Sequence, residues 1–149
     1  MGCHFLLQTF KLTPHKIKYL DINVTKYLQA LYEENYTTLI DEFKEEFKKV
    51  IKEISKLDIN NDFEHEKLCK KELEIVTKDI NVTINYLKTE CTATEFSWLS
   101  EIFREIVEIC PSQEFVDELY KLAEKYPEET EKYNVMNFIN EAAGYLEEK

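Results

Sequence analysis

The stretch LIDEFKEEFKKVIKEI, residues 39–54, places its apolar side chains at helical spacing. These side chains are Leu39, Ile40, Phe43, Phe47, Val50, Ile51 and Ile54. Lysines and glutamates fill the opposite side, where opposite charges four residues apart support a helix. The pattern predicts an amphipathic helix with one face in a core.

Helical spacing continues on both sides of this stretch. Upstream, Thr13-Pro14 is typical of a helix start, which predicts a helix over residues 14–33 and a break at residues 35–37. Downstream, Asp62 is the expected cap of a helix that ends near Lys78. Residues 79–87 fit both the alternation of a strand and the spacing of a helix, and we favour a helix with a kink near Asn81.

The last third of the chain predicts three further helices. The first opens at Thr94-Glu95 and ends at Cys110-Pro111. The second is capped by Ser112 and stops before Pro127. The third starts at Pro127, is interrupted at residues 133–134 and ends near residue 146.

The composition favours an all-α fold. The chain has 149 residues but only 2 Gly and 3 Pro, fewer turn-forming residues than a sheet protein of this size needs. Six or seven helices joined by short loops would pack as antiparallel neighbours in stacked helical hairpins. No linker divides the sequence, so we expect a single helical domain over residues 1–149.

Catalytic and cofactor motifs are not found. The glycines stand only at positions 2 and 144, which excludes a glycine-rich phosphate loop. The serines have no nucleophile-elbow context. An enzyme would need a concave pocket with carboxylates of perturbed pKa, which a sequence cannot show. Because the phosphate-loop and nucleophile motifs are not found, we expect no enzyme and no cofactor.

A metal site is also not expected. The four cysteines are far apart and form no CxxC pair. His65 and Cys69 are four residues apart, so both could touch one ion on a helix surface. No second matched pair follows, and an exposed histidine beside a buried cysteine is the simpler interpretation.

The negative charge is concentrated near the end of the sequence. From Glu95 to Lys149 there are 14 Asp and Glu against 5 Lys and Arg, a net of −9, whereas residues 1–94 carry 16 against 14. Such a surface repels nucleic acid and attracts cationic proteins. Glu101, Glu105 and Glu108 lie along one helical edge, where like charges cost stability. A role in binding and a role in solubility both explain their presence.

No run of residues reaches the length of a membrane-spanning segment or of a signal-peptide core. We expect a cytoplasmic protein that does not enter the membrane. The oligomeric state is not predicted by any of these patterns.

Several motifs after residue 94 resemble those of a known family. They are EFSWLSEIF at residues 95–103, Phe115, KYPEE at residues 125–129, YNV at residues 133–135, Ile139, and EA at residues 141–142. Together they resemble the C-terminal part of small acidic helical immunity proteins of bacterial polymorphic-toxin and contact-dependent growth inhibition systems. The resemblance implies a helical, often HEAT-like protein that binds and blocks a cognate toxin domain, commonly a cationic nuclease.

An inhibitor of a nuclease gains both steering and occlusion by placing carboxylates over the basic cleft. Partner-binding residues are expected on this acidic part of the chain, and they are Trp98, Glu101, Glu105, Glu108, Asp117, Glu118 and Tyr120. Trp98 and Tyr120 are the expected anchors among the carboxylates. A helical adaptor for a cellular protein would use the same surface and remains the alternative.

Overall fold

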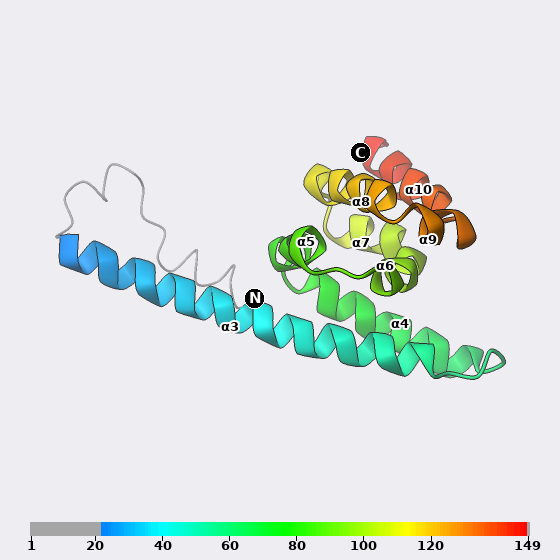
Figure 1. Ribbon diagram of the computed structural model, residues 1–149, viewed down its shortest axis with the longest axis horizontal. Coiled ribbons are helices and arrows are strands. Elements are labelled where there is room, and N and C mark those ends of the chain that lie inside the picture. Colours follow the sequence, from blue (N-terminus) through cyan, green and yellow to red (C-terminus); the bar gives the residue numbers. More distant parts are fainter. Residues whose placement is uncertain (1–21, 149) are drawn as a thin grey trace. The chain divides into compact units, whose positions relative to one another are not determined.

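The computed structural model describes residues 22–148 (Figure 1). Its elements are α3 (Ile22–Ser55), α4 (Asp62–Thr77), α5 (Ile80–Thr89), α6 (Ala93–Leu99), the 3-10 turn η1 (Ser100–Ile102), α7 (Phe103–Ile109), α8 (Gln113–Lys125), α9 (Pro127–Lys132) and α10 (Val135–Glu147). The described residues contain no strand, so the all-α helical bundle is confirmed. The expected helix start at Pro14 lies outside the described residues.

The chain divides into two compact units, Met1–Glu42 and Phe43–Lys149. Helix α3 contributes residues 22–42 to the first unit and residues 43–55 to the second. All the sites discussed below are formed by residues of the second unit. The expectation of one domain stays a prediction.

The break predicted at residues 35–37 is wrong, because α3 continues through them. The Thr37 hydroxyl donates to the Glu33 carbonyl oxygen at 2.8 Å, which accommodates a β-branched polar residue inside the helix. The Tyr32 and Tyr36 rings, one turn apart, stack with centroids 6.1 Å apart. Residues 22–55 hold neither Gly nor Pro, so nothing in this stretch forces the helix to end.

Side-chain caps determine where the next helices start. Asn61, rather than the expected Asp62, caps α4 by accepting a hydrogen bond from the Glu64 backbone N–H. Asp79 caps α5 by accepting from the Asn81 N–H at 3.0 Å. Residues 80–89 are therefore helical, as favoured, and the break falls just before Asp79 instead of near Asn81.

The helix expected from residue 94 starts earlier and is divided. Thr92 caps α6 through a capping box in which its hydroxyl accepts from the Glu95 N–H and the Glu95 carboxylate accepts from the Thr92 N–H. The 3-10 turn η1 then separates α6 from α7. This tightening rotates the side chains that follow residue 100 relative to a regular helix.

The boundaries of the last three helices agree with the sequence analysis. Ser112 caps α8, and Pro127 stands in the first turn of α9. The interruption expected at residues 133–134 is confirmed, since Asn134 adopts the left-handed conformation with φ of 53°. Helix α10 then packs against α7 and α8.

Aromatic side chains dominate the core of the second unit. Phe43 and Phe47 of α3 stack at 5.4 Å, and both meet the Tyr86 ring of α5 edge-on. Phe103 of α7 and Phe115 of α8 meet at 6.4 Å, again edge to face. These contacts join the end of α3 to α5 and join α7 to α8. The helical elements that carry the sites below are therefore held by a mainly apolar interior rich in aromatic rings.

Candidate functional site

The face of α4 toward η1 carries a group of polar side chains. His65, Cys69 and Glu72 are spaced i, i+4 and i+7, so they share one side of the helix. Glu101 of η1 lies across from them, with its Oε2 3.1 Å from His65 Nε2 and 3.9 Å from Cys69 Sγ. Cys69 Sγ lies 3.9 Å from His65 Nε2 and 3.8 Å from Nδ1. Three metal-ligating side chains thus meet within 4.8 Å.

Glu72 lies behind this group in a site without compensating polar partners. Its side chain is fully buried, and neither carboxylate oxygen has a hydrogen-bond partner among the residues that the structure describes. Burial, and secondarily the charge of Glu101, raise the pKa of Glu72 to about 8. Burial together with the charges of Glu72, Glu101 and Glu105 raises the pKa of Cys69 to about 12. Three glutamates and the thiol of Cys69 therefore interact electrostatically across α4, η1 and α7.

Trp98 and Glu101 separate two cavities. One, of about 430 Å³, lies beside the connection of α3 to α4 and is also lined by His65 and Asp62. The other, of about 570 Å³, lies between the α6 and η1 segment and the α9 and α10 segment. Trp98, Tyr133 and Phe138 supply aromatic surface to this second cavity, and its charged lining residues are Glu101, Glu129 and Lys132. We call it the aromatic cavity.

The two other glutamates of the expected edge are exposed on α7. Glu108 accepts from Arg104 Nε at 3.2 Å, and the same guanidinium reaches Glu141 of α10 at 3.1 Å. Glu105 is exposed and has no ion-pair partner among the described residues. The structure thus brings Trp98 and Glu101 together at the two cavities, while Glu105 and Glu108 continue along the solvent side.

The three expected residues of α8 have different surroundings. Asp117 is exposed and accepts from the Gln113 amide at 2.9 Å. Tyr120 is half-buried, and its hydroxyl donates to Asn140 Oδ1 of α10 at 3.0 Å. Glu118 differs from the solvated carboxylate that the sequence suggested, since only 6% of it is exposed. Its placement follows from the turn of α8, which puts it beside the buried Leu119 and Leu122 face.

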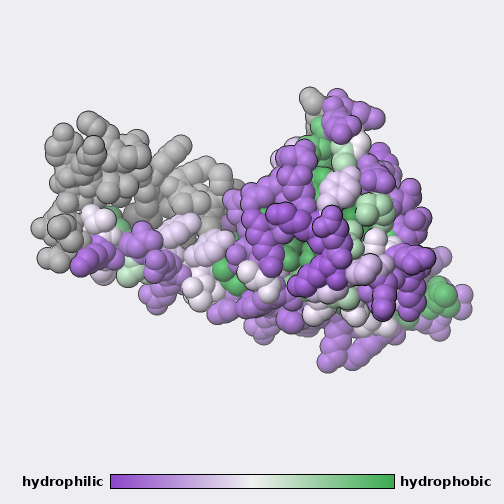
Figure 2. Space-filling model, turned by 45° about the horizontal axis from the view of Figure 1, so that its top comes forward, coloured by the Kyte–Doolittle hydropathy of each residue, from purple (hydrophilic) through white to green (hydrophobic). Residues whose placement is uncertain are grey.

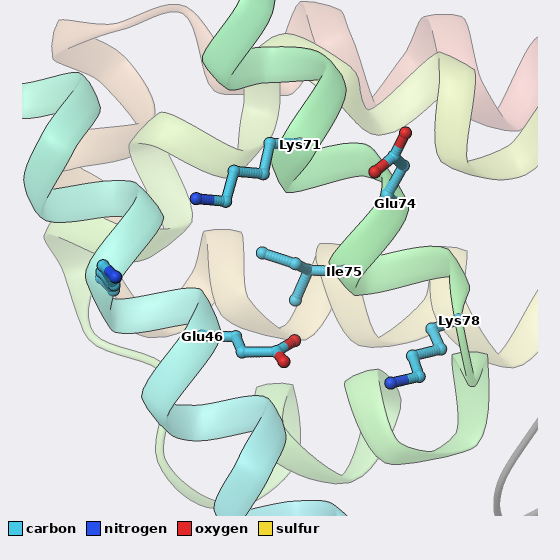
Figure 3. A pocket seen from close by; sticks show the side chains of 6 residues that line it. Glu46, Lys71, Glu74, Ile75 and Lys78 are labelled. Carbon is cyan, nitrogen blue, oxygen red and sulfur yellow. The ribbon is translucent and has the colours of Figure 1, made fainter.

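A third cavity lies between the end of α3 and α4, and Figure 3 shows its lining side chains. Glu46 extends into it from α3, Lys71 and Ile75 extend from α4, and Lys78 follows directly after α4. Its volume is about 430 Å³. The lining has charges of both signs but no histidine or cysteine, so it offers no matched set of transition-metal ligands.

The condition for an enzyme, a cavity lined by a carboxylate of perturbed pKa, is met only in part. Glu101 and His65 line a cavity, but Glu72, whose pKa is raised, does not belong to the lining of any of the three cavities described above. A substrate in these cavities would not reach its carboxylate. We therefore assign no catalytic residue.

Sequence reasoning missed Glu72 and the aromatic cavity. The signal for Glu72 was its spacing from His65 and Cys69, which places it on their side of the helix. The cavity combines residues from four elements and has no comparable local signal.

Comparison with protein-family models, curated protein sequences and solved structures finds no match to this chain. Among the described helices, none combines the length and the apolar character that crossing a membrane requires.

Proposed function

We propose that this protein binds and neutralises a basic protein domain, as an immunity protein does with its toxin. The proposal is carried by exposed carboxylates on α7 to α10 that form no ion pair with any described residue. These carboxylates belong to Glu105, Asp117, Glu124, Glu128, Glu131, Glu147 and Glu148. Since no described lysine or arginine forms an ion pair with them, they leave a negative potential available to a cationic partner.

The distribution of surface polarity supports an interaction of this kind. Figure 2 shows one face of the protein, on which hydrophilic residues cover most of the surface and hydrophobic residues appear in smaller areas. An interface on such a surface would rely on charge complementarity and on a few well-placed anchors, not on a broad apolar patch.

The aromatic cavity offers a place for such an anchor. A guanidinium or ammonium group entering it would meet the faces of Trp98 and Tyr133 and the carboxylates of Glu101 and Glu129. Lys132 now lies over the Tyr133 ring at 5.0 Å, which shows that the ring accepts a cation. An incoming arginine would compete with Lys132 for this position.

We infer the nature of the partner from the resemblance of residues 94–146 to immunity proteins. A nuclease toxin presents a basic cleft to its substrate, and a carboxylate-rich surface placed over that cleft would exclude the nucleic acid. An adaptor for a basic cellular protein would use the same surface, so the test has to separate inhibition from binding.

The first experiment is co-expression with a candidate basic nuclease-toxin domain, with cell growth as the readout. Rescue of growth, together with a complex on size-exclusion chromatography, supports the proposal. A complex without rescue supports the adaptor instead. If growth is not rescued and no complex forms, binding of this partner is contradicted.

A matched pair of variants then tests the acidic surface. The triple variant Glu105→Gln, Glu128→Gln, Glu131→Gln removes three unpaired charges from α7 and α9. The control Glu45→Gln, Glu46→Gln, Glu74→Gln removes the same charge from α3 and α4. We expect the first variant to slow association about tenfold or more and the control to change it little, because steering depends on charges near the interface. Equal effects would contradict a local acidic interface.

A further inference from the structure

We propose that His65, Cys69 and Glu101 bind a divalent transition-metal ion, with Zn²⁺ the best match, and so link α4 to η1. This site shares Glu101 with the aromatic cavity, whereas His65 and Cys69 do not line that cavity. One nitrogen, one sulfur and one oxygen atom are a donor set that zinc accepts.

The distances between the three side chains suit tetrahedral coordination. Zinc bonds of about 2.0–2.1 Å to nitrogen and oxygen and about 2.3 Å to sulfur place the ligand atoms roughly 3.3–3.6 Å apart. The observed separations are 3.1 Å for His65 Nε2 to Glu101 Oε2 and 3.9 Å from Cys69 Sγ to each of these atoms. Shifts of a few tenths of an ångström would bring all three to one ion.

The imidazole has to turn slightly as the ion binds. Cys69 Sγ is almost equally far from the two ring nitrogens of His65, at 3.8 and 3.9 Å. A rotation of the ring that aims the Nε2 lone pair at the centre of the group satisfies the ligand geometry. His65 is only half-buried, so the ring has room for this movement.

The buried carboxyl group of Glu72 is a second observation that a cation at this site would explain. Its fully buried carboxyl group has no hydrogen-bond partner within residues 22–148, and it lies on the same side of α4 as Cys69. A buried carboxylate without a partner is costly unless a positive charge lies close to it. Glu72 is not among the three ligands that meet within 4.8 Å, so we assign it to the shell outside them.

The cavity beside the site gives the ion access and a fourth ligand. His65 and Glu101 both line the cavity of about 430 Å³ at the connection of α3 to α4. A water molecule in this cavity can complete the tetrahedron. The thiolate and imidazole favour zinc over Mg²⁺ and Ca²⁺, which prefer oxygen ligands.

Titration of the full-length protein with Co²⁺ tests the site, because a cobalt ion bound by a thiolate gives a sulfur-to-cobalt charge-transfer band. We expect this band, tetrahedral-type visible absorption and displacement of Co²⁺ by Zn²⁺ at one ion per chain. The variants Cys69→Ser and His65→Ala should abolish the band or weaken Zn²⁺ affinity about tenfold or more, since even partners outside the ligand shell change affinity about 10–100-fold.

The matched control is Cys110→Ser. Cys110 is also half-buried, and its thiol donates to the Thr77 carbonyl oxygen at 3.6 Å, away from the site. This variant should keep the band and the affinity. The sequence contains further possible metal ligands in Cys3, His4 and His15. Loss of the sulfur-to-cobalt band in Cys69→Ser therefore assigns that band to this site.

Two results would overturn the proposal. One is the absence of a sulfur-to-cobalt band in the unmodified, reduced protein. The other is a band and a Zn²⁺ affinity that are unchanged in both Cys69→Ser and His65→Ala. Circular dichroism of each variant without metal verifies that the helices are intact, and Glu101→Gln provides a third ligand variant that leaves the fold of α4 untouched.

Discussion

The Tyr86 hydroxyl of α5 lies 2.8 Å from Oε1 and 2.9 Å from Oε2 of Glu95. Both side chains are almost completely buried, and Glu95 Oε1 also accepts the Thr92 N–H at 3.0 Å. Glu95 therefore fastens the first turn of α6 to the middle of α5. The hydrogen bond to the carboxylate raises the pKa of Tyr86 in addition to the effect of burial, so the hydroxyl stays protonated as the donor.

Removal of this hydroxyl should destabilise the second unit. Tyr86→Phe leaves a buried carboxylate with one donor fewer, and a hydrogen bond to a charged group contributes about 1.5–3 kcal/mol. We expect a loss of that size in the free energy of unfolding measured with urea. The control is Tyr27→Phe, whose side chain is 64% exposed and which should change stability by less than about 0.5 kcal/mol. Equal losses of stability in the two variants would contradict a stabilising hydrogen bond from Tyr86 to Glu95.

Glu72 should make stability fall as the pH rises. Between its ordinary pKa of 4.5 and its folded pKa of about 8, the folded protein keeps a proton that the unfolded chain releases. Each pH unit in this range lowers the free energy of unfolding by at most about 1.4 kcal/mol, or on the order of 4 kcal/mol in total. Below pH 4.5 both states are protonated, and the contribution of Glu72 no longer varies.

Glu72→Gln tests this linkage, because the amide has a similar shape and does not titrate. Urea unfolding with a chelator present, at pH 4.5 and at pH 8, should show a smaller loss of stability in the variant than in the unmodified protein. The difference between the two pH values cancels any constant cost of burying the amide. A loss of the same size in both proteins would contradict a raised pKa for Glu72.

Asn134 should be the position in the second unit where glycine is tolerated best. Its φ of 53° lies in the left-handed region, which side chains with a branched Cβ avoid. We expect Asn134→Gly to be neutral or slightly stabilising and Asn134→Val to cost about 1–2 kcal/mol. Thermal unfolding of the two variants measures the difference, and the reverse order of stability would contradict this turn between α9 and α10.

A proline at position 35 distinguishes a continuous α3 from a broken one. Proline in a helix interior removes a hydrogen bond and costs about 3 kcal/mol or more. In Asn35→Pro we expect lower helix content by far-ultraviolet circular dichroism, whereas a loop at residues 35–37 would accept proline without loss. Asn60→Pro, in the turn between α3 and α4, is the control that should lose less helix.

The helices were predictable because their signals are local. The apolar spacing of residues 39–54, the Ser112 cap, Pro127 in a first turn and the interruption before Val135 each act within a few residues. The errors arose where the same local signal has two meanings. Residues 35–37 contain turn-forming types that a helix also accepts when the hydroxyl bonds back to a carbonyl oxygen.

The candidate sites depend on contacts between distant parts of the sequence. Spacing alone placed His65 and Cys69 on one face of α4, but Glu101 is 32 residues beyond Cys69 and reaches it only because η1 packs near α4. The same holds for Glu118, whose burial could not be distinguished from solvation by charge and spacing.

The amino-acid sequence alone established the all-α class, most helix boundaries and the excess of negative charge in residues 95–149. Periodicity, capping and charge are properties of neighbouring residues, which is why they can be inferred without coordinates. Only the tertiary structure decided which carboxylates are buried and which donor atoms meet. Those outcomes depend on how helices distant in sequence pack against each other. Packing placed Glu101 against His65 and left Glu72 buried without a hydrogen-bond partner in the described part of the chain.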